Sequence, residues 1–299
     1  MDLTWLEDYL ALAEKLNFSR AAEARNVTQP AFSRRIRALE EWAGTPLFVR
    51  TTHGVSLTAA GEHFRGHAEA LVRNLHQLRR ETLEVADGKS AALSFAATHA
   101  LSFTFFPKWI RRHEHIAGLG AINLISDSMQ ACEQIMLRGD ASFLLCHYHR
   151  DAHSRFEPEQ FASVIVGTDT LVPLTAPDGK GRARWSLAGA DRARYLAYSA
   201  ESGLGRIISA SSTAADQITA LDQVFTSHLA ATLLSMARSG DGIAWLPRTL
   251  AEQDIEAGRL VEAGPAAMAI PVDIRLFRPA ARLSPAAETL WALLVEETA

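Results

Sequence analysis

Residues 18–61 constrain the fold more than any other part of this chain, because they read as two short helices joined by a tight turn and followed by a hairpin. In the second helix Phe32, Ile36 and Leu39 recur at helical spacing, which predicts an inward-packed apolar face. Another face gathers side chains of the kind that hydrogen-bond base edges and phosphates in a DNA major groove. These polar residues are Gln29, Ser33, Arg34 and Arg37.

The ends of these helices are also marked in the sequence. Ser19 is a good N-cap for the first helix, which then continues through Arg20. Thr28 is the expected N-cap of the second helix, and Pro30 falls in its first turn, where a missing N–H costs nothing. A preceding helix over residues 2–16 completes a three-helix core through four apolar residues at helical spacing, namely Leu3, Leu6, Leu10 and Ala13.

A basic hairpin follows. Residues 47–57 predict two short strands with Gly54 in the turn and Arg50 placed to reach a phosphate. Between residues 18 and 65 there are seven arginines and four glutamates, whereas the whole chain carries a net charge of −4. Such a local excess suits a polyanionic partner. An ordinary surface subdomain is the alternative, but it leaves the agreement of periodicity, caps, turn and hairpin unexplained.

Residues 58–89 predict one long helix that begins at Thr58. Its apolar residues follow a heptad spacing that is broken at Thr82, the pattern of a helix that pairs with a copy of itself. Dimerisation would hold two recognition helices at a fixed half-site spacing. A helix packed only on its own domain remains the alternative. The heptad residues are Phe64, Ala68, Leu71, Leu75, Leu78 and Val85.

From Phe18 to Gly61 the chain resembles the DNA-binding signature of LysR-type transcriptional regulators. The resemblance extends over the whole length. It implies an α/β protein with a winged helix-turn-helix DNA-binding domain (1–58), a dimerisation linker helix (59–89) and a periplasmic-binding-protein-like effector domain (90–299). That last domain would comprise two α/β subdomains, one formed by 91–162 with 267–299 and the other by 163–266.

Members of that family bind double-stranded promoter DNA, respond to a small-molecule effector, and commonly assemble as homotetramers built from homodimers. The polar helix face and the resemblance together predict a set of DNA-binding residues. They are Ser19, Arg20, Thr28, Gln29, Pro30, Ser33, Arg34, Arg37 and Arg50.

From residue 91 onward, strands and helices alternate, which predicts an open, mostly parallel sheet. Ligands of such sheets bind outside the carboxyl ends of the strands. Here those ends carry hydroxyl groups beside helix starts, an arrangement that favours anions but also occurs in simple helix caps. An apolar cleft is a further possibility. The predicted effector-binding residues are Thr98, His99, Ser102, Ser128, Met129, Ser199, Ser202 and Thr226.

Two segments, THALSFTFFP (98–107) and GDGIAWLP (240–247), resemble a branch of the family that includes hypochlorite-responsive regulators. This resemblance implies an alternative signal, the oxidation of methionine or cysteine. Leu204 and Leu229 stand where that branch has methionines, whereas Met129 lies beside a predicted effector loop.

Other functions find little support in the sequence. No nucleophile elbow, Walker loop or dinucleotide fingerprint occurs, so we expect neither an enzyme nor a cofactor. A metal sensor would have to use Cys146, His147, His149 and His153, with His113 and His115, but none of these has paired ligand spacing. Two cysteines imply no disulfide framework. There is no membrane-length apolar run or signal peptide, which favours the cytoplasm.

Overall fold

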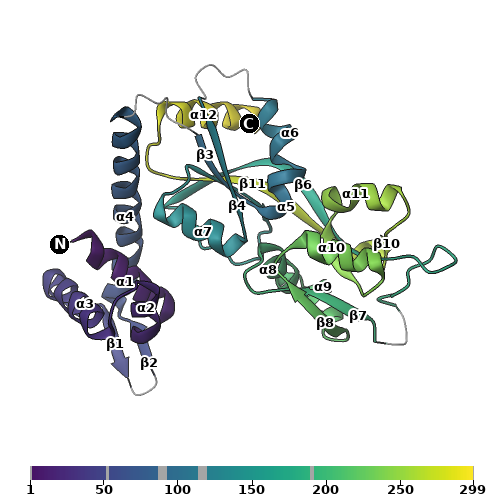
Figure 1. Cartoon of the computed structure of the whole chain (residues 1–299), viewed down its shortest axis with the longest axis horizontal. Coiled ribbons are helices and arrows are strands. Elements are labelled where there is room, and N and C mark those ends of the chain that lie inside the picture. The colour runs from purple at the N-terminus through teal and green to yellow at the C-terminus, as the bar shows by residue number, and fades with distance from the viewer. Residues whose placement is uncertain (1, 52–53, 87–92, 114–119, 189–191, 299) are drawn as a thin grey trace. The chain divides into compact units, whose positions relative to one another are not determined.

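The computed structural model describes residues 2–51, 54–86, 93–113, 120–188 and 192–298 (Figure 1). The chain divides into two compact units. The first consists of residues 1–88 with 137–140, and the second of residues 89–136 with 141–299. Each unit is described separately below.

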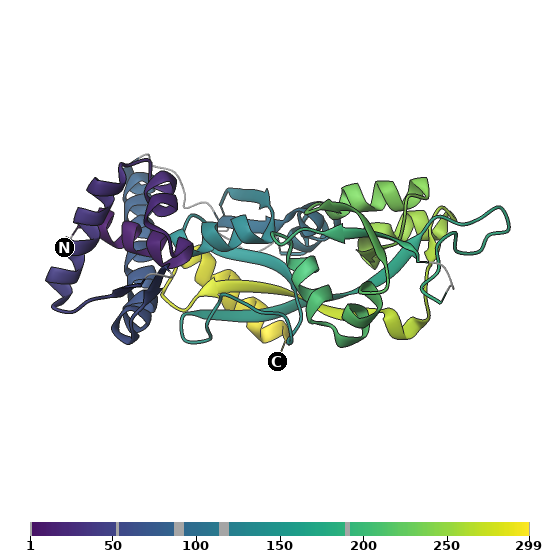
Figure 2. The same ribbon diagram turned by 90° about the horizontal axis from the view of Figure 1, so that it is seen from below.

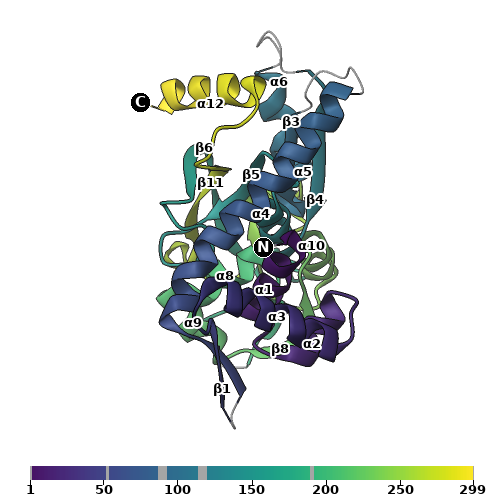
Figure 3. The ribbon, with the colours of Figure 1, turned by 90° about the vertical axis from the view of Figure 1, so that its left-hand side faces the viewer.

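The first unit is a three-helix cluster with a hairpin and a long helix, as the sequence predicts. Its elements are α1 (Leu3–Lys15), α2 (Phe18–Ala24), α3 (Gln29–Ala43), β1 (Phe48–Thr51), β2 (Gly54–Leu57) and α4 (Ala59–Ala86). The strands pair antiparallel, and Figure 3 shows their hairpin projecting from the helices.

The apolar face predicted for α3 is confirmed, because Phe32, Ile36 and Leu39 are all buried. The pattern predicted for α1 is only partly right. Tyr9 and Leu12 are buried there, while Leu3 and Leu10 are only partly buried. The buried residue is therefore Tyr9 and not its predicted neighbour Leu10. The Tyr9 hydroxyl donates to the Gly61 carbonyl oxygen at 2.6 Å.

The N-cap predicted for the first helix of the motif was wrong. Asn17 caps α2, since its side-chain oxygen accepts from the Arg20 amide at 3.0 Å. The helix therefore starts at Phe18, two residues earlier than a cap at Ser19 implies, and Phe18 packs edge-on against Phe32. Thr28 is the N-cap residue of α3 but makes no side-chain cap hydrogen bond, and Pro30 lies in the first turn.

Buried and half-buried polar contacts hold the first unit together. Asp8 is fully buried and accepts from Arg25 Nε at 2.8 Å and from Arg35 Nη1 at 3.2 Å. Glu40 Oε1 accepts from the amides of Leu47 and Phe48, at 2.9 and 3.1 Å, and so ties α3 to the hairpin. Arg25 and Arg35, two arginines of the predicted basic segment, therefore form ion pairs inside the unit.

Helix α4 starts where the sequence predicts. The Thr58 hydroxyl accepts from the Gly61 amide at 2.9 Å, and the helix is described as far as Ala86. Its heptad residues divide into two groups. Phe64 and Ala68 pack into the core of this unit, whereas the other leucines are 43–60% exposed, and the Val85 side chain lies outside the described part. The exposed leucines are Leu71, Leu75 and Leu78.

The second unit contains a seven-stranded sheet. Its strand order is β10 (Val261–Glu262), β6 (Phe161–Thr175), β11 (Ile270–Pro279), β5, β3 and β4, and β9 (Ala244–Pro247) also pairs with β6. At one end of this sheet β3 (Leu93–Thr98) pairs parallel with β4 (Ile122–Asp127) and with β5 (Phe143–Tyr148). An apolar cluster there includes Phe95, Trp109 and Leu290. The helices of this half are α5 (His99–Thr104), α6 (Phe106–Arg111), α7 (Met129–Arg138) and α12 (Pro285–Thr298).

The other half of the second unit has its own apolar cluster, which includes Leu196, Leu233 and Trp245. Its parallel pair is β7 (Arg194–Tyr198) and β8 (Asp222–Ser227). The remaining elements are α8 (Gly203–Ala210), α9 (Ser212–Ile218), α10 (Ala230–Ser239), β9 (Ala244–Pro247), α11 (Arg248–Glu256), β10 (Val261–Glu262) and the 3₁₀ turn η1 (Ala266–Met268).

Two long strands, β6 (Phe161–Thr175) and β11 (Ile270–Pro279), pair antiparallel and run between these halves (Figure 2). The predicted mostly parallel sheet was therefore wrong, because among the described strands of this sheet only β3 pairs parallel with its neighbours. The chain leaves the first half on β6 and returns on β11, so these strands must oppose each other. The helix expected to reach His115 is also split at Phe105, and residues 114–119 lie outside the described part.

Replacing Asp8 with Ala should destabilise the first unit by about 2 kcal/mol, because it leaves two guanidinium groups without their buried carboxylate. Arg25 and Arg35 keep 30% and 36% side-chain exposure, which limits the loss. Native-state hydrogen exchange of the α1 and α3 amides measures the effect. The matched control is Glu14→Ala, which removes a surface pair with Lys15; an equal loss of protection in both variants would contradict the prediction.

Candidate functional site

The polar face of α3 and the base of the hairpin meet in the first unit. Arg50 Nη2 donates to Ser33 Oγ at 3.3 Å, and its guanidinium carbon lies 4.0 Å from the centre of the Phe18 ring. Ser33 is half-buried, and the other predicted DNA-binding residues are exposed. These exposed residues are Ser19, Arg20, Thr28, Gln29, Pro30, Arg34, Arg37 and Arg50.

The charge of this surface comes from fewer arginines than the sequence count suggested. Arg25 and Arg35 are paired with Asp8, and Arg65 lies 3.4 Å from Glu69. In the described part of the chain, no ion pair engages Arg20, Arg34 or Arg37. These three side chains and Arg50 are the exposed cations that α2, α3 and the hairpin contribute to this surface.

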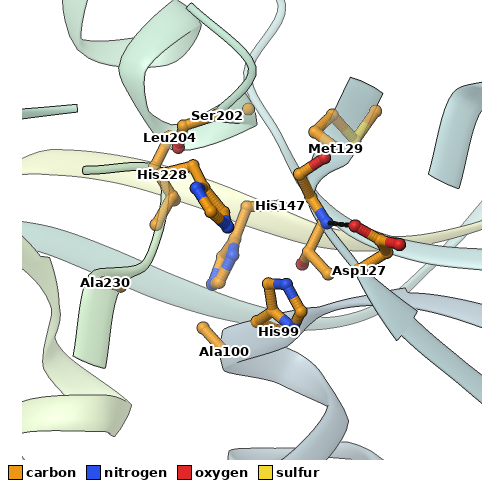
Figure 4. Close-up of a pocket in the computed structure, with 12 residues that line it drawn as sticks. His99, Ala100, Asp127, Met129, His147, Ser202, Leu204, His228 and Ala230 are labelled. Carbon is orange, nitrogen blue, oxygen red and sulfur yellow. Dashed lines mark hydrogen bonds between the residues drawn. The ribbon is translucent and has the colours of Figure 1, made fainter. Parts of the chain in front are cut away.

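A cavity of about 30 Å³ lies in the second unit, between its two halves (Figure 4). It sits at the carboxyl ends of β3, β4 and β5 and at the first turns of α5, α7, α8 and α10. In this conformation it has room for only a very small ligand. Its lining comprises Thr98, His99, Ala100, Asp127, Ser128, Met129, His147, Ser202, Gly203, Leu204, His228 and Ala230.

Five of the eight predicted effector-binding residues line this cavity: Thr98, His99, Ser128, Met129 and Ser202. Ser102 lies behind it and reaches the Ser126 hydroxyl at 2.8 Å. The remaining two residues do not line it. Ser199 has a buried hydroxyl elsewhere, and Thr226 is exposed and accepts from the Gln223 amide at 3.0 Å.

Two lining histidines were missed as effector contacts. His147 is the penultimate residue of β5, so the rule that selected the other strand ends would have found it had β5 been included. His228 stood in a loop that the sequence had marked, but only its neighbour Thr226 was chosen. Figure 4 shows both rings gathered in the cavity with that of His99, whose centre lies 5.9 Å from that of His228.

The polar groups of the cavity are held by local hydrogen bonds. His99 Nδ1 lies 3.1 Å from Ser126 Oγ, and the Asp127 carboxylate accepts from the Ser128 amide at 2.7 Å. The Ser128 and Ser202 hydroxyls cap α7 and α8. The buried Thr98 hydroxyl has no hydrogen-bond partner in the part of the chain that is described.

Both halves of the second unit contact each other beside the cavity. Glu133 on α7 is fully buried, and its carboxylate accepts hydrogen bonds from both terminal nitrogens of Arg206 on α8, at 2.5 and 3.0 Å. The Gln130 amide donates to the Glu201 carbonyl oxygen at 3.2 Å. A Cβ atom at Gly203 would lie 3.0 Å from Met129 Cγ, so glycine permits α7 and α8 to approach this closely.

Both cysteines considered for oxidant sensing are buried and have unreactive thiols. Cys132 and Cys146 are 0% and 1% exposed. Burial raises the pKa of the Cys132 thiol to about 12 and also raises that of Cys146. Both therefore stay protonated at neutral pH, and the thiol is the less reactive form. Among residues 93–113 and 120–298, where described, no three His, Cys, Asp or Glu side chains converge as metal ligands.

The candidate metal-binding histidines have other partners. His147 lies 3.3 Å from Asp169, and His113 contacts the Trp109 carbonyl oxygen and Glu297. His149 and His153 line a second small cavity behind α8. His115 lies outside the described residues.

Comparison with known proteins identifies the class. Residues 3–62 match the family described as bacterial regulatory helix-turn-helix protein, lysR family, and residues 86–299 match the LysR substrate binding domain. This chain therefore belongs to the LysR family of transcriptional regulators. The fold agrees with that family, since both the winged helix-turn-helix and the two-part α/β domain are present.

Among its relatives is the HTH-type transcriptional regulator YjiE of Escherichia coli (strain K12), 33% identical over 99% of this chain and 95% of that protein. Full-length HypT from Salmonella typhimurium, described as a hypochlorite-specific LysR-type transcriptional regulator, is similar with a TM-score of 0.59 and 29% identity, covering 100% and 99% of the two chains. The structure of Vibrio fischeri DarR in complex with DNA is similar with a TM-score of 0.58 and 28% identity, covering 98% of each chain.

No described helix is long and apolar enough to cross a membrane.

Proposed function

We propose that this regulator reads promoter DNA with α3 and the base of its hairpin, and that a small molecule bound between the halves of its second unit controls this. The observation that supports it best is the exposed polar face of α3, to which Arg50 is joined through Ser33. A recognition helix in the major groove needs exposed amide, hydroxyl and guanidinium groups on one face. The regulator DarR, similar over its whole length, is described in complex with DNA.

Arg34→Ala should weaken specific operator binding by about tenfold or more, because it removes a base-edge donor from α3. Arg50→Ala should instead weaken binding to all sequences and lower the salt slope by about one, as expected for a phosphate contact. Mobility shifts with the intergenic DNA beside its own gene, at several salt concentrations, distinguish the two. Arg150→Ala, an exposed arginine of the second unit, is the control. Unchanged operator affinity in Arg34→Ala would contradict the DNA-reading assignment.

We further propose that α4 pairs with a second copy of the chain, and that such dimers assemble into tetramers. Leu71, Leu75 and Leu78 lie one or two turns apart and expose 43–60% of their surface. Exposed leucines at heptad spacing are the seam of a coiled coil. Pairing there would bury them and hold two α3 helices at a fixed spacing.

Glutamate at both Leu71 and Leu75 should dissociate the dimer, because it places like charges in the apolar seam. Light scattering of the purified protein gives the mass. Asn74→Glu adds the same charge at an exposed polar position of the same helix and should leave the assembly intact. If the double variant kept the mass of the wild-type assembly, dimerisation through these leucines would be contradicted.

For the effector we propose a small polar molecule in the cavity lined by Thr98, Ser128 and Ser202, which lies at the first turns of several helices. Free N–H groups of such first turns suit an acceptor group on the ligand. The buried Thr98 hydroxyl, which lacks a described partner within the protein, supports a ligand contact. The Glu133–Arg206 pair joins α7 to α8 and so links the two halves of the unit beside the cavity.

Thr98→Val should leave the melting temperature of the free protein unchanged, since no internal hydrogen bond is lost. It should reduce the shift in melting temperature caused by any effector found in a thermal-shift screen of metabolites. Thr226→Val is the matched control at an exposed position outside the cavity and should keep the full shift. An equal response in both variants would place the effector elsewhere.

Control by oxidation is the second candidate, favoured by the likeness to HypT. Met129 lines the cavity but is 9% exposed, and both cysteines are buried. We therefore rank reversible ligand binding above oxidation.

We propose that the chain acts in the cytoplasm as a regulator and not as an enzyme.

A further inference from the structure

His147 joins the effector cavity to the long strands between the halves. It lies at the end of β5, and its ring lines the cavity. Its Nε2 lies 3.3 Å from Oδ2 of Asp169, a residue of β6, and the two side chains are only 3% and 1% exposed. The pair is therefore buried between the first half of the unit and the strand that leaves it.

Asp169 is fully engaged as an acceptor. Its Oδ1 accepts from the amides of Thr170 at 2.7 Å and of Thr249 at 3.3 Å. Its Oδ2 accepts from the Thr249 hydroxyl at 2.5 Å in addition to facing His147. Burial by itself would raise the pKa of this carboxyl, but the hydrogen bonds from His147 and the threonines outweigh it and lower the pKa, so Asp169 is ionised at neutral pH.

The charge state of Asp169 decides where His147 carries its proton. A carboxylate can only accept hydrogen bonds, so the proton of a neutral His147 must sit on Nε2. Its Nδ1 is then an unprotonated acceptor, and in the described part of the chain no hydrogen bond engages it. Since Nε2 is engaged by Asp169 and His147 lines the cavity, Nδ1 is the ring nitrogen that remains for a ligand there.

We propose that Asp169 is the positioning residue of the effector cavity: it fixes the tautomer of His147 so that the cavity offers an acceptor at Nδ1 and selects an effector with an O–H or N–H donor there. This inference rests on the proposed role of the cavity as the effector site. His99 and His228 are the other titratable rings at the cavity, with Glu201 3.9 Å from His228.

The same carboxylate reaches the other half of the unit. Thr249 lies in the first turn of α11, whose N-cap residue, Pro247, makes no side-chain cap hydrogen bond. Asp169 supplies that cap from the neighbouring strand β6. A change at His147 therefore acts on a residue that also holds the start of a helix in the second half.

Asp169→Asn provides a sharp test. The amide oxygen can keep the two backbone N–H donors of Oδ1, and the amide nitrogen then replaces Oδ2 and donates to Nε2. His147 must move its proton to Nδ1, so the cavity would offer a donor in place of an acceptor. Thr249→Val is the matched control, because it removes one donor to the same oxygen without changing the partner of His147.

The measurement is the ¹⁵N spectrum of histidine side chains in the full-length protein at pH 7.5, with the His147 signals assigned by their loss in His147→Gln. Wild type and Thr249→Val should show a protonated Nε2 and an unprotonated Nδ1, and Asp169→Asn the reverse. A wild-type His147 protonated on Nδ1, or on both nitrogens, would overturn the proposal even if the Asn variant failed to fold.

Two probes of equal size test the selectivity. Formamide offers N–H donors, whereas formate at this pH has only acceptors. Formamide should shift the wild-type Nδ1 signal in the direction of an accepted hydrogen bond. Formate can accept from first-turn amides but cannot donate to Nδ1, so it should not cause that shift, and Asp169→Asn should gain a response to formate. An equal wild-type response to both probes would overturn the selectivity. The tautomer readout needs neither DNA nor effector, so its failure is distinct from loss of operator binding or of an effector response.

Discussion

The antiparallel pairing of β6 with β11 is the contact on which the second unit depends. Ten residues of β11 pair along β6, from Ile270 opposite Leu171 to Pro279 opposite Phe161. Each half has its own apolar cluster, so the halves are separate cores joined through these two strands and through side-chain bridges. A cavity between two such cores would change shape if the cores moved, and the proposed control by a ligand relies on this geometry.

Polar side chains connect that cavity to its frame. The Glu133–Arg206 pair links α7 to α8, and Asp169 links His147 to the start of α11. A buried ion pair gives little net stability but is costly to break on one side only. Such contacts therefore favour a small number of defined arrangements. The first unit follows the same logic, because buried Asp8 and the bonds from Glu40 fix the helices and hairpin that present α3.

Much of the first unit could be predicted from local pattern. The apolar face of α3, the antiparallel hairpin of β1 and β2, and the start of α4 at Thr58 all depend on residues close together in sequence. The prediction failed where distant contacts decide. Phe18 at the start of α2 packs on Phe32 while Asn17 provides the cap, and pairing with buried Asp8 removed Arg25 and Arg35 from the basic surface.

The candidate effector site shows the same division. Thr98, Ser128 and Ser202 were predicted from strand ends and helix starts, which the local sequence marks, and all three line the cavity. The sequence by itself determined that the chain reads DNA, because a recognition helix needs only one short polar face. Only the tertiary structure decided that β6 and β11 oppose each other and that Asp169 meets His147, 22 residues away in sequence. Such a contact depends on which strands become neighbours, and spacing along the chain carries no record of that.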